Sequence, residues 1–465
     1  MNGVALALAL AFARPDSVAP LTFEDFRAQV AAHHPVARQA RLLESIADGN
    51  VRAARGSFDP VFSAAWDRKD YAGKRYYDYL DASLKVPTWV GVDLKLGFER
   101  TQGDYFASDR RTPGQGLLTA GVSIPLGQRL LTDERRTALA QARAMREYAA
   151  GERAALVNKL MYTAAGVYAS WFEAWRRVAL AREAVGLAEF RLEALRRRVV
   201  QGDAAAIDTL EAGLEVQRRR VQQAEAGLAW RNASLVLEGM LWNERGEPGT
   251  LDPGAEPSTA GLALRAPSPD DVRAWVQLAE QGHPDLQKAA AKLRDATAER
   301  SLAAQRVFVP DAEVSLAGVG ASRDGVPTPV GDAGDRKLGA TLKVPLLFRK
   351  ERGKFEATDA KAAQAGLDRA LVRRGIAIAI ESSANALGAF SELVSLQEAT
   401  VAQARALRDG EQRKFDAGES TLFLVNARER AVIDEELKRI ALQAKLVSTG
   451  AELAVALGQP TLSDR

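Results

Sequence analysis

The chain has 465 residues, of which 26% are charged and only 6% aromatic. This aromatic fraction is low for a protein with large globular cores, and the composition favours long helices packed side by side. Lys and Arg total 63 against 60 for Asp and Glu, which gives a net charge of only +3 and argues against a nucleic-acid partner. There is no cysteine, and this excludes thiol catalysis, thiolate metal sites, disulfides and a lipid-anchoring cysteine.

The N-terminal residues 1–20 resemble a signal peptide and a short following segment. An apolar run from Val4 to Ala13 ends in an Ala-Phe-Ala sequence of the kind cleaved after export, although no Lys or Arg precedes it. A frayed apolar terminus is the alternative. Elsewhere no apolar run approaches the ~20 residues that a membrane-spanning helix needs. We therefore expect any membrane crossing to use strands.

The three histidines, His33, His34 and His283, accompany two prolines, Pro35 and Pro284. Proline is favoured in the first turn of a helix, so these His-Pro pairs indicate helix starts. A metal or acid–base role is not expected. The sequence also lacks a glycine-rich phosphate loop, a nucleophile–base pair and a clustered set of acids. We expect no enzyme activity, no metal and no cofactor.

The chain repeats one order of elements. Each His-Pro pair opens a helix that leads to alternating residues and then to a long helical segment. The first repeat covers residues 21–245, with strands in 58–125 and a long helical hairpin over 128–245. The second covers 270–460, with strands in 309–345 and a hairpin over 348–457, before a tail at 461–465. Between the repeats, residues 246–269 form a linker rich in proline: Pro248, Pro253, Pro257, Pro267 and Pro269.

Long helices are predicted where proline is absent, from residue 126 to 247 and from 346 to 459. Each stretch is interrupted once, at 200–203 and at 416–419. Apolar residues with three-four spacing predict helices that lie along partners. One line holds Ile207, Leu210, Leu214, Val221, Ala224, Leu228 and Leu235; another holds Ile433, Leu437, Ile440, Ala444, Val447, Ala451 and Ala454. The last helix carries a second line at Leu442, Leu446, Leu453 and Leu457, as a helix in a tube wall would.

The strand segments alternate between apolar and polar residues, as a sheet with one apolar face requires. The same alternation also suits a soluble, half-buried sheet. One chain offers too few strands to close a barrel in lipid, but several chains could close it together. Whether the segments 80–86 and 90–99 enter such a barrel is open. The tyrosine-rich segment 71–79 lies between strands and is compatible with an interfacial aromatic belt, a polar extracellular loop or a solvated turn.

This order of elements, with its duplication, resembles the TolC family of outer-membrane efflux proteins. The residues 122–126 and 342–346 are similar to that family's passage from strand to helix, and 199–210 and 415–426 to its two periplasmic tip turns. The resemblance implies an α+β membrane protein: a trimeric transmembrane β-barrel, with four strands from each protomer, continued by a long antiparallel α-helical barrel. It also implies the outer membrane of a Gram-negative bacterium, a periplasmic domain, a periplasmic adaptor and an inner-membrane pump.

Two sets of residues carry the expected site. Pro125 and Pro345 are placed at the passage from strand to helix, because proline lacks an N–H that would be orphaned there. Since each helical stretch must reverse at a glycine, the periplasmic tip and the adaptor-docking site are expected at Gly202, Asp203, Phe415, Gly418, Glu419 and Ser420.

Asp208 is a candidate for an acidic pore gate, because the family commonly places aspartates just beyond the tip turns. The corresponding residue of the second half is Leu424, and the next expected acid is Ala427. A solvated carboxylate in the first turn of a helix, favoured by the helix dipole, is the alternative interpretation of Asp208.

The expected function is a passive export duct in a tripartite efflux or type I secretion system, with outer-membrane lipid around it. Pivoting near Gly202 and Gly418 would open the tip. A coiled-coil tether without a pore is the alternative, and it would purify without detergent.

Overall fold

The computed structural model describes residues 20–127, 131–202, 205–252, 254–258, 265–321 and 335–459. Apart from Pro20, the predicted signal peptide lies outside these residues, as do Asp203 and the tail. None of the described helices has the length and apolarity to cross a membrane. The chain divides into two compact units: residues 42–152 with 285–372, and residues 1–41 with 153–284 and 373–465.

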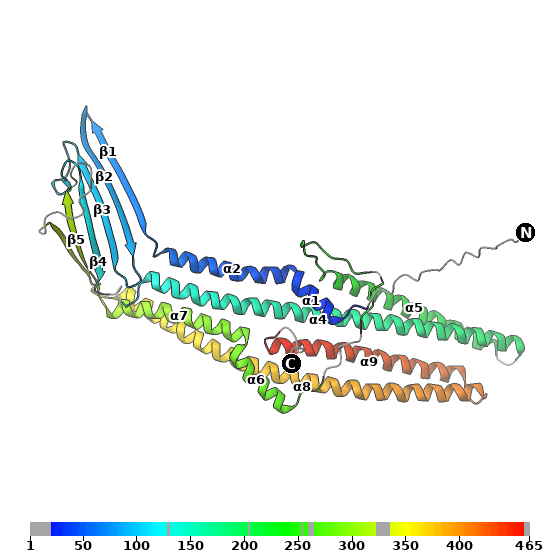
Figure 1. Cartoon of the computed structure of the whole chain (residues 1–465). Helices are drawn as coiled ribbons and strands as arrows, with labels where there is room; N and C mark the ends of the chain where they lie inside the picture. Colours follow the sequence, from blue (N-terminus) through cyan, green and yellow to red (C-terminus); the bar gives the residue numbers. More distant parts are fainter. Residues whose placement is uncertain are drawn as a thin grey trace, which may run out of the picture. The chain divides into compact units, whose positions relative to one another are not determined.

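The first of these units contains one antiparallel sheet with strand order β1-β2-β3-β4-β5-β6 (Figure 1). Four strands come from the first half of the chain and two from the second. The described sheet therefore has six strands where the resemblance implied four, because the segment 80–86 and the part of the segment 90–99 from residue 93 onward pair in it. Val90 and Val92, which the alternation had included, precede the strand. The strands are β1 (Val61–Tyr71), β2 (Lys74–Pro87), β3 (Asp93–Gln102), β4 (Leu117–Pro125), β5 (Asp311–Ala321) and β6 (Arg336–Lys343).

The tyrosine-rich segment is not a loop. Strand β2 begins at Lys74, so Tyr76, Tyr77 and Tyr79 belong to it. Only Ala72 and Gly73 separate β1 from β2, and both have positive φ, at 50° and 72°. Two residues with positive φ make the tight turn whose twist matches that of paired strands. The sequence Ala-Gly concealed this turn, because alanine rarely adopts such a conformation.

The two faces of the sheet differ in polarity. Paired residues of antiparallel strands point to the same side, and one such row is Phe62, Leu84, Leu96, Ala120 and Gly318. The neighbouring row on the opposite face holds Ser63, Ser83, Gly97 and Thr119. Ion pairs cross this polar face, with Lys85 Nζ at 2.9 Å from Asp93 Oδ2 and Lys95 Nζ at 3.8 Å from Glu313 Oε1.

Helices α2 (Pro35–Gly56) and α7 (Pro284–Phe308) each begin at the proline of a His-Pro pair, as predicted. Within the unit that holds the sheet, both pack against the first part of α4 (Glu134–Gln201). Arg146 Nε lies 2.7 Å from Asp48 Oδ1 on α2, and Lys288 Nζ of α7 lies 3.0 Å from Glu152 Oε2. A one-turn helix, η1 (Ser108–Arg110), lies between β3 and β4.

The second unit is built on two helical hairpins (Figure 1). Helix α4 turns into α5 (Ala206–Glu238), and α8 (Arg349–Asp416) turns into α9 (Leu422–Ala456). Helices α4 and α8 each have 68 residues, close to the predicted lengths. Helix α4 begins a few residues later than expected because Asp133 caps it, its Oδ1 accepting the Arg136 N–H at 2.8 Å.

A core of this second unit surrounds Tyr168 and Trp171 of α4, which are both fully buried. Helix α1 (Phe23–His33) packs there through Phe26 and Val30. Tyr168 Oη donates toward two carbonyl oxygens, Leu21 O at 2.8 Å and Ser258 O at 3.2 Å, and burial raises the pKa of this tyrosine to about 12. The described part of the linker therefore folds onto the core. It leads to α6 (Pro269–Gly282), which opens with a capping box between Ser268 and Asp271.

Pro125 is the last residue of β4, and Pro345 lies two residues beyond the end of β6. Neither begins a helix, since α4 starts at Glu134 and α8 at Arg349. Gly127, two residues after Pro125, is more tightly constrained by its surroundings. A Cβ on Gly127 would overlap the carbonyl oxygen of Pro310 and lie 2.8 Å from Ala312 N.

Gly127→Ala is therefore expected to force β4 and the start of β5 apart. Overpacking of this kind costs about 1–3 kcal/mol. The measurement is the thermal unfolding midpoint of detergent-extracted protein. Gly114→Ala is the control, because a Cβ there meets nothing within 4 Å. Equal midpoints for the two variants would contradict the packing described at Gly127.

Candidate functional site

The two helical hairpins reverse at the predicted glycines. Gly202 has φ +84° and Gly418 has φ +79°, and a Cβ on either would meet nothing within 4 Å. The Gly418 N–H donates to Phe415 O at 3.0 Å, and the Glu419 N–H donates to Lys414 O at 2.8 Å. This pair of bonds closes a helix with a left-handed residue. Glycine is therefore required at these turns by the left-handed backbone conformation, and not by a lack of room for a side chain.

The two returning helices start differently. Thr421 caps α9, its hydroxyl accepting the Leu424 N–H at 3.4 Å. The hydroxyl of the neighbouring Ser420 instead donates to a Glu411 carboxylate oxygen. Helix α5 begins after Ala205 and has no side-chain cap. The second turn is thus more strongly fixed than the described part of the first.

Asp208 lies in the first turn of α5 and is half-buried. This is the position at which a helix dipole favours a carboxylate. Leu424 occupies the corresponding turn of α9 and is exposed. Both interpretations of Asp208, gate and dipole partner, fit this placement.

An apolar cluster joins the ends of all four helices. Leu195, Ala212 and Leu422 are buried together, and Leu192 and Phe415 pack against them. The guanidinium of Arg198 lies 5.5 Å from the centre of the Phe415 ring. Phe415, which the sequence placed in the docking site, therefore also packs against the other helices at the hairpin ends.

A groove of about 620 Å³ lies beside this cluster, between α4 and α8. Phe190 is its most exposed apolar residue, with 69% of its surface accessible. Sequence reasoning missed this groove, because its walls come from helices more than 200 residues apart. Its polar lining includes Glu183, Arg191, Arg198, Arg408, Asp409 and Gln412.

Ion pairs connect the two hairpins, and one of them is largely buried. Arg191 of α4 donates to Glu429 Oε2 of α9 at 2.6 Å and to Asn426 Oδ1 at 2.9 Å, and the two charged side chains are 12% and 6% exposed. On α5, Glu215 pairs with Arg219 at 2.7 Å and approaches Arg430 of α9 at 4.0 Å. Sequence periodicity cannot reveal such pairs, because the lines it detects are apolar.

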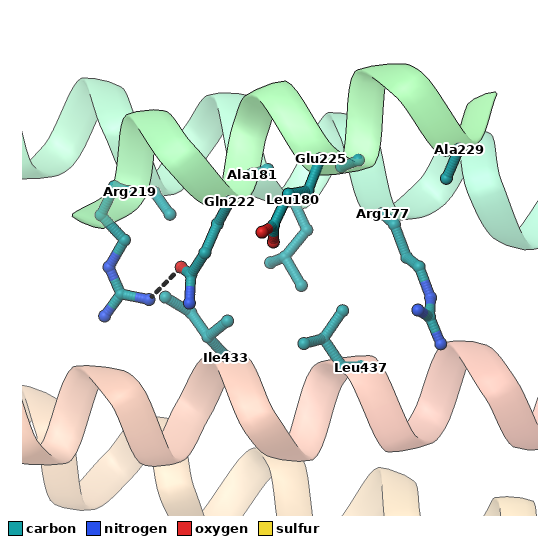
Figure 2. Close-up of a pocket in the computed structure, with 11 residues that line it drawn as sticks. Arg177, Leu180, Ala181, Arg219, Gln222, Glu225, Ala229, Ile433 and Leu437 are labelled. Carbon is teal, nitrogen blue, oxygen red and sulfur yellow. Dashed lines mark hydrogen bonds between the residues drawn. The ribbon is translucent and has the colours of Figure 1, made fainter. Parts of the chain in front are cut away.

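A cavity of about 380 Å³ separates α4, α5 and α9 near Arg219 (Figure 2). Arg219 donates to Gln222 Oε1 at 3.1 Å within α5. Ile433 and Leu437 point from α9 toward α5 (Figure 2). The hairpins therefore meet through scattered apolar contacts and ion pairs here, and not through a continuous apolar core.

The described elements define a class of protein: paired long helical hairpins together with an antiparallel sheet that exposes one apolar face. Residues 275–459 match the sequence model of the outer membrane efflux protein family. The chain is also 25% identical over 302 residues to Protein CyaE of Bordetella pertussis, a match that spans 60% of that protein and 63% of this chain.

Solved structures have the same fold. The outer membrane protein VceC of Vibrio cholerae is 16% identical, with a TM-score of 0.66 over 94% of this chain and 96% of that one. The MtrE outer membrane channel of Neisseria gonorrhoeae, in its open state, is 14% identical, with a TM-score of 0.67 over 94% of this chain and 89% of that one. The match to the sequence model thus confirms the resemblance to outer-membrane efflux proteins, a family of channels, and the solved structures show that the fold is shared.

Gly418→Ala is expected to weaken the tip by about 1–2 kcal/mol, the cost of a left-handed conformation for a residue with a side chain. Gly410→Ala is the matched control, because Gly410 lies inside α8 with equally open surroundings. Alanine there should leave stability unchanged or raise it by up to ~1 kcal/mol. Amide hydrogen exchange of residues 412–425 measures both. Protection lost equally in the two variants would argue against a conformational role for Gly418.

Glu429→Gln is expected to destabilise the contact between α4 and α9 by about 2 kcal/mol, because Arg191 then stays buried without its carboxylate. Glu189→Gln is the control: its pair with Arg220 is 2.7 Å long, close to the 2.6 Å of the buried pair, but its side chains are 44% and 54% exposed, and such pairs contribute less than ~1 kcal/mol. Thermal unfolding midpoints compare the two. The apolar double variant Arg191→Met with Glu429→Leu should recover stability. Equal losses for Glu429→Gln and Glu189→Gln would show that burial of the pair is immaterial.

Proposed function

We propose that this chain is one of three protomers of a passive export duct that crosses the outer membrane and reaches into the periplasm of a Gram-negative bacterium. The exposed apolar face of the sheet carries the proposal. Phe62 and Trp66 of β1 are 70% and 66% exposed, and Leu338 and Leu342 of β6 are 66% and 67% exposed. Water disfavours such a face, whereas lipid accepts it. A soluble coiled-coil tether would have no use for it.

The helices support association with further copies. The predicted apolar lines of α9 are largely buried within the chain, at Ile440, Ala444, Leu446 and Leu453 among others. The line on α5 is not. Its residues are 52% to 74% exposed: Ile207, Leu210, Leu214, Val221, Leu228 and Leu235. A different helix, α8, also exposes apolar residues, namely Ile378, Leu393, Leu396 and Leu407. Two different exposed surfaces suit head-to-tail contacts that close into a ring.

In this function the duct makes and breaks no bond, and an inner-membrane pump supplies the energy. A periplasmic adaptor docks at the helix ends, on the turns at Gly202, Asp203, Gly418, Glu419 and Ser420. The groove beside Phe190 adds an apolar, charged-rimmed surface for the same partner. Asp208 at the start of α5 narrows the closed tip. Opening separates the hairpins where ion pairs, and not a continuous apolar core, join them. Tripartite efflux and type I secretion both fit this mechanism.

Leu214→Lys with Leu228→Lys tests the association. Two charges on the α5 line would have to be buried between protomers, so trimers should be lost while the chain still folds. Chemical crosslinking of detergent-extracted outer membranes measures the threefold species, and planar bilayers measure its conductance. The control replaces both leucines with methionine, which keeps the surface apolar. Trimers and conductance that survive both lysines would remove α5 from the interface, and a parent chain soluble without detergent would end the proposal.

A further inference from the structure

We propose that all six strands lie in the membrane wall and that β1 of one copy pairs with β6 of a second copy. The inference rests on the proposed trimer. Three copies of a six-stranded sheet then give a wall of 18 strands. The four strands per protomer implied by the family resemblance would give 12.

The apolar face is continuous through the two additional strands. Leu80, Ala82, Leu84 and Val86 of β2 are paired with Arg100, Phe98, Leu96 and Leu94 of β3 on this face. The same rows continue into β1 on one side and into β4 on the other. Leu94 and Leu96 are 44% and 49% exposed, as is expected for side chains that contact lipid and not protein. A hairpin projecting into water would not need this pattern.

The apolar segment also shifts from strand to strand as it must in tilted strands. On β1 the apolar residues are centred on Ala64. Following the paired residues across the sheet from Ala64, through Ala82, Phe98 and Leu118, leads to Gly320 on β5. On β5 the apolar-face residues are Ala312, Val314, Leu316, Gly318 and Gly320, and their middle is Leu316.

The centre of the apolar segment on β5, Leu316, is thus four residues from Gly320, the residue in line with the centre on β1. Four strand-to-strand steps separate β1 from β5, so the shift is one residue per strand. One residue advances the chain by about 3.3 Å along a strand, and neighbouring strands lie about 4.8 Å apart. These two lengths give strands tilted by roughly 35° from the barrel axis. Membrane barrels tilt by about 35–45°. The strands β2 and β3 take part in the same progression as the others, so we place them at the same depth in the bilayer.

Both edges of the sheet need a partner. The residues of β1 and β6 are all exposed, and the outer backbone groups of both strands have no neighbour within the described sheet. Lipid tolerates no such edge. Because the count is even and neighbouring strands are antiparallel, β1 and β6 run in opposite directions. A seam between copies is then antiparallel like every other pair.

The chemistry of the two edges matches in one register. With Ala64 opposite Ala340, Phe62 meets Leu342 and Trp66 meets Leu338 on the apolar face. On the polar face Ser63 meets Thr341, and Asp67 meets Lys337, which places opposite charges across the seam. The occupant of each edge is therefore a second copy of this chain. Since barrel diameter grows roughly linearly with strand number, a barrel of 18 strands would have about 1.5 times the diameter of a barrel of 12 strands.

Disulfide trapping tests the seam directly, because the chain contains no cysteine. Ser63→Cys combined with Thr341→Cys should shift the oxidised protein from one-chain mass to two- and three-chain masses on denaturing gels, since directly paired residues meet the geometry of a disulfide. Either single variant is the negative control. Ser63→Cys with Ser83→Cys is the positive control, because these hydroxyls lie 2.8 Å apart in one chain and their disulfide leaves the mass unchanged.

Trimer content is measured in parallel by lysine crosslinking. If trimers form but Ser63→Cys traps no neighbour when combined with cysteine at 337, 339, 341 or 343, the seam is excluded and the proposed function stands. If no trimers form, both fall. Spin labels provide a second measurement: labels at 82 and 96 should be more accessible to oxygen, and those at 83 and 95 to a water-soluble nickel reagent. Equal access at all four positions would place β2 and β3 outside the bilayer.

Discussion

A sheet that contacts lipid must pair every backbone N–H and C=O group, and its two edges are where that requirement is hardest to meet. In this chain the edges are β1 and β6, which come from opposite halves of the sequence. The two halves are joined within the sheet by β4 and β5, so neither half can satisfy its own strands. The helices repeat the same dependence on partners, because α5 and α8 expose apolar residues that other helices would cover.

The helical unit is held together unevenly along its length. Around Tyr168 and Trp171 the contacts are aromatic, apolar and fully buried, and the Trp171 indole N–H donates to Ser234 Oγ at 3.0 Å. This core joins α4 and α5 to the N-terminal helices and the described linker, and includes no residue of α8 or α9. Toward the helix ends the two hairpins meet at a small apolar cluster, and through the pairs of Arg191 with Glu429 and of Arg430 with Glu215. Buried ion pairs contribute little net stability but fix geometry. The first hairpin is thus firmly packed around Tyr168 and Trp171, whereas the contact between the two hairpins rests on fewer apolar residues.

Much of the architecture could be predicted from local signals. Proline before a helix located Pro35 and Pro284, and the absence of proline gave the extent of α4 and α8. Glycine between heptad-like stretches located both reversals, since the left-handed conformation at Gly202 and Gly418 is a property of the backbone itself. The tip's role as a docking site stays a prediction.

Features that depend on distant residues could not be predicted. The number of strands was unclear because alternation does not say which segments pair, and Ala72 concealed the first hairpin turn. Gly127 is constrained by Pro310, and Arg191 by Glu429, and both contacts join residues that are nearly 200 or more apart in the sequence. Single-sequence periodicity reports which face of an element is apolar, but not what meets it.

The pairing of β4 with β5 also determines the order in which the sheet can fold. Neighbouring strands from β1 to β4 follow one another closely in the chain, and so do β5 and β6, but Ser123 and Glu313 at the central pair are 190 residues apart. Closing so long a loop is slow compared with forming a local hairpin. Two partial sheets, with four and two strands, would thus form first. The inner edges of β4 and β5 stay unpaired until the intervening helices are complete, and during this interval the nascent chain is most exposed to misassembly.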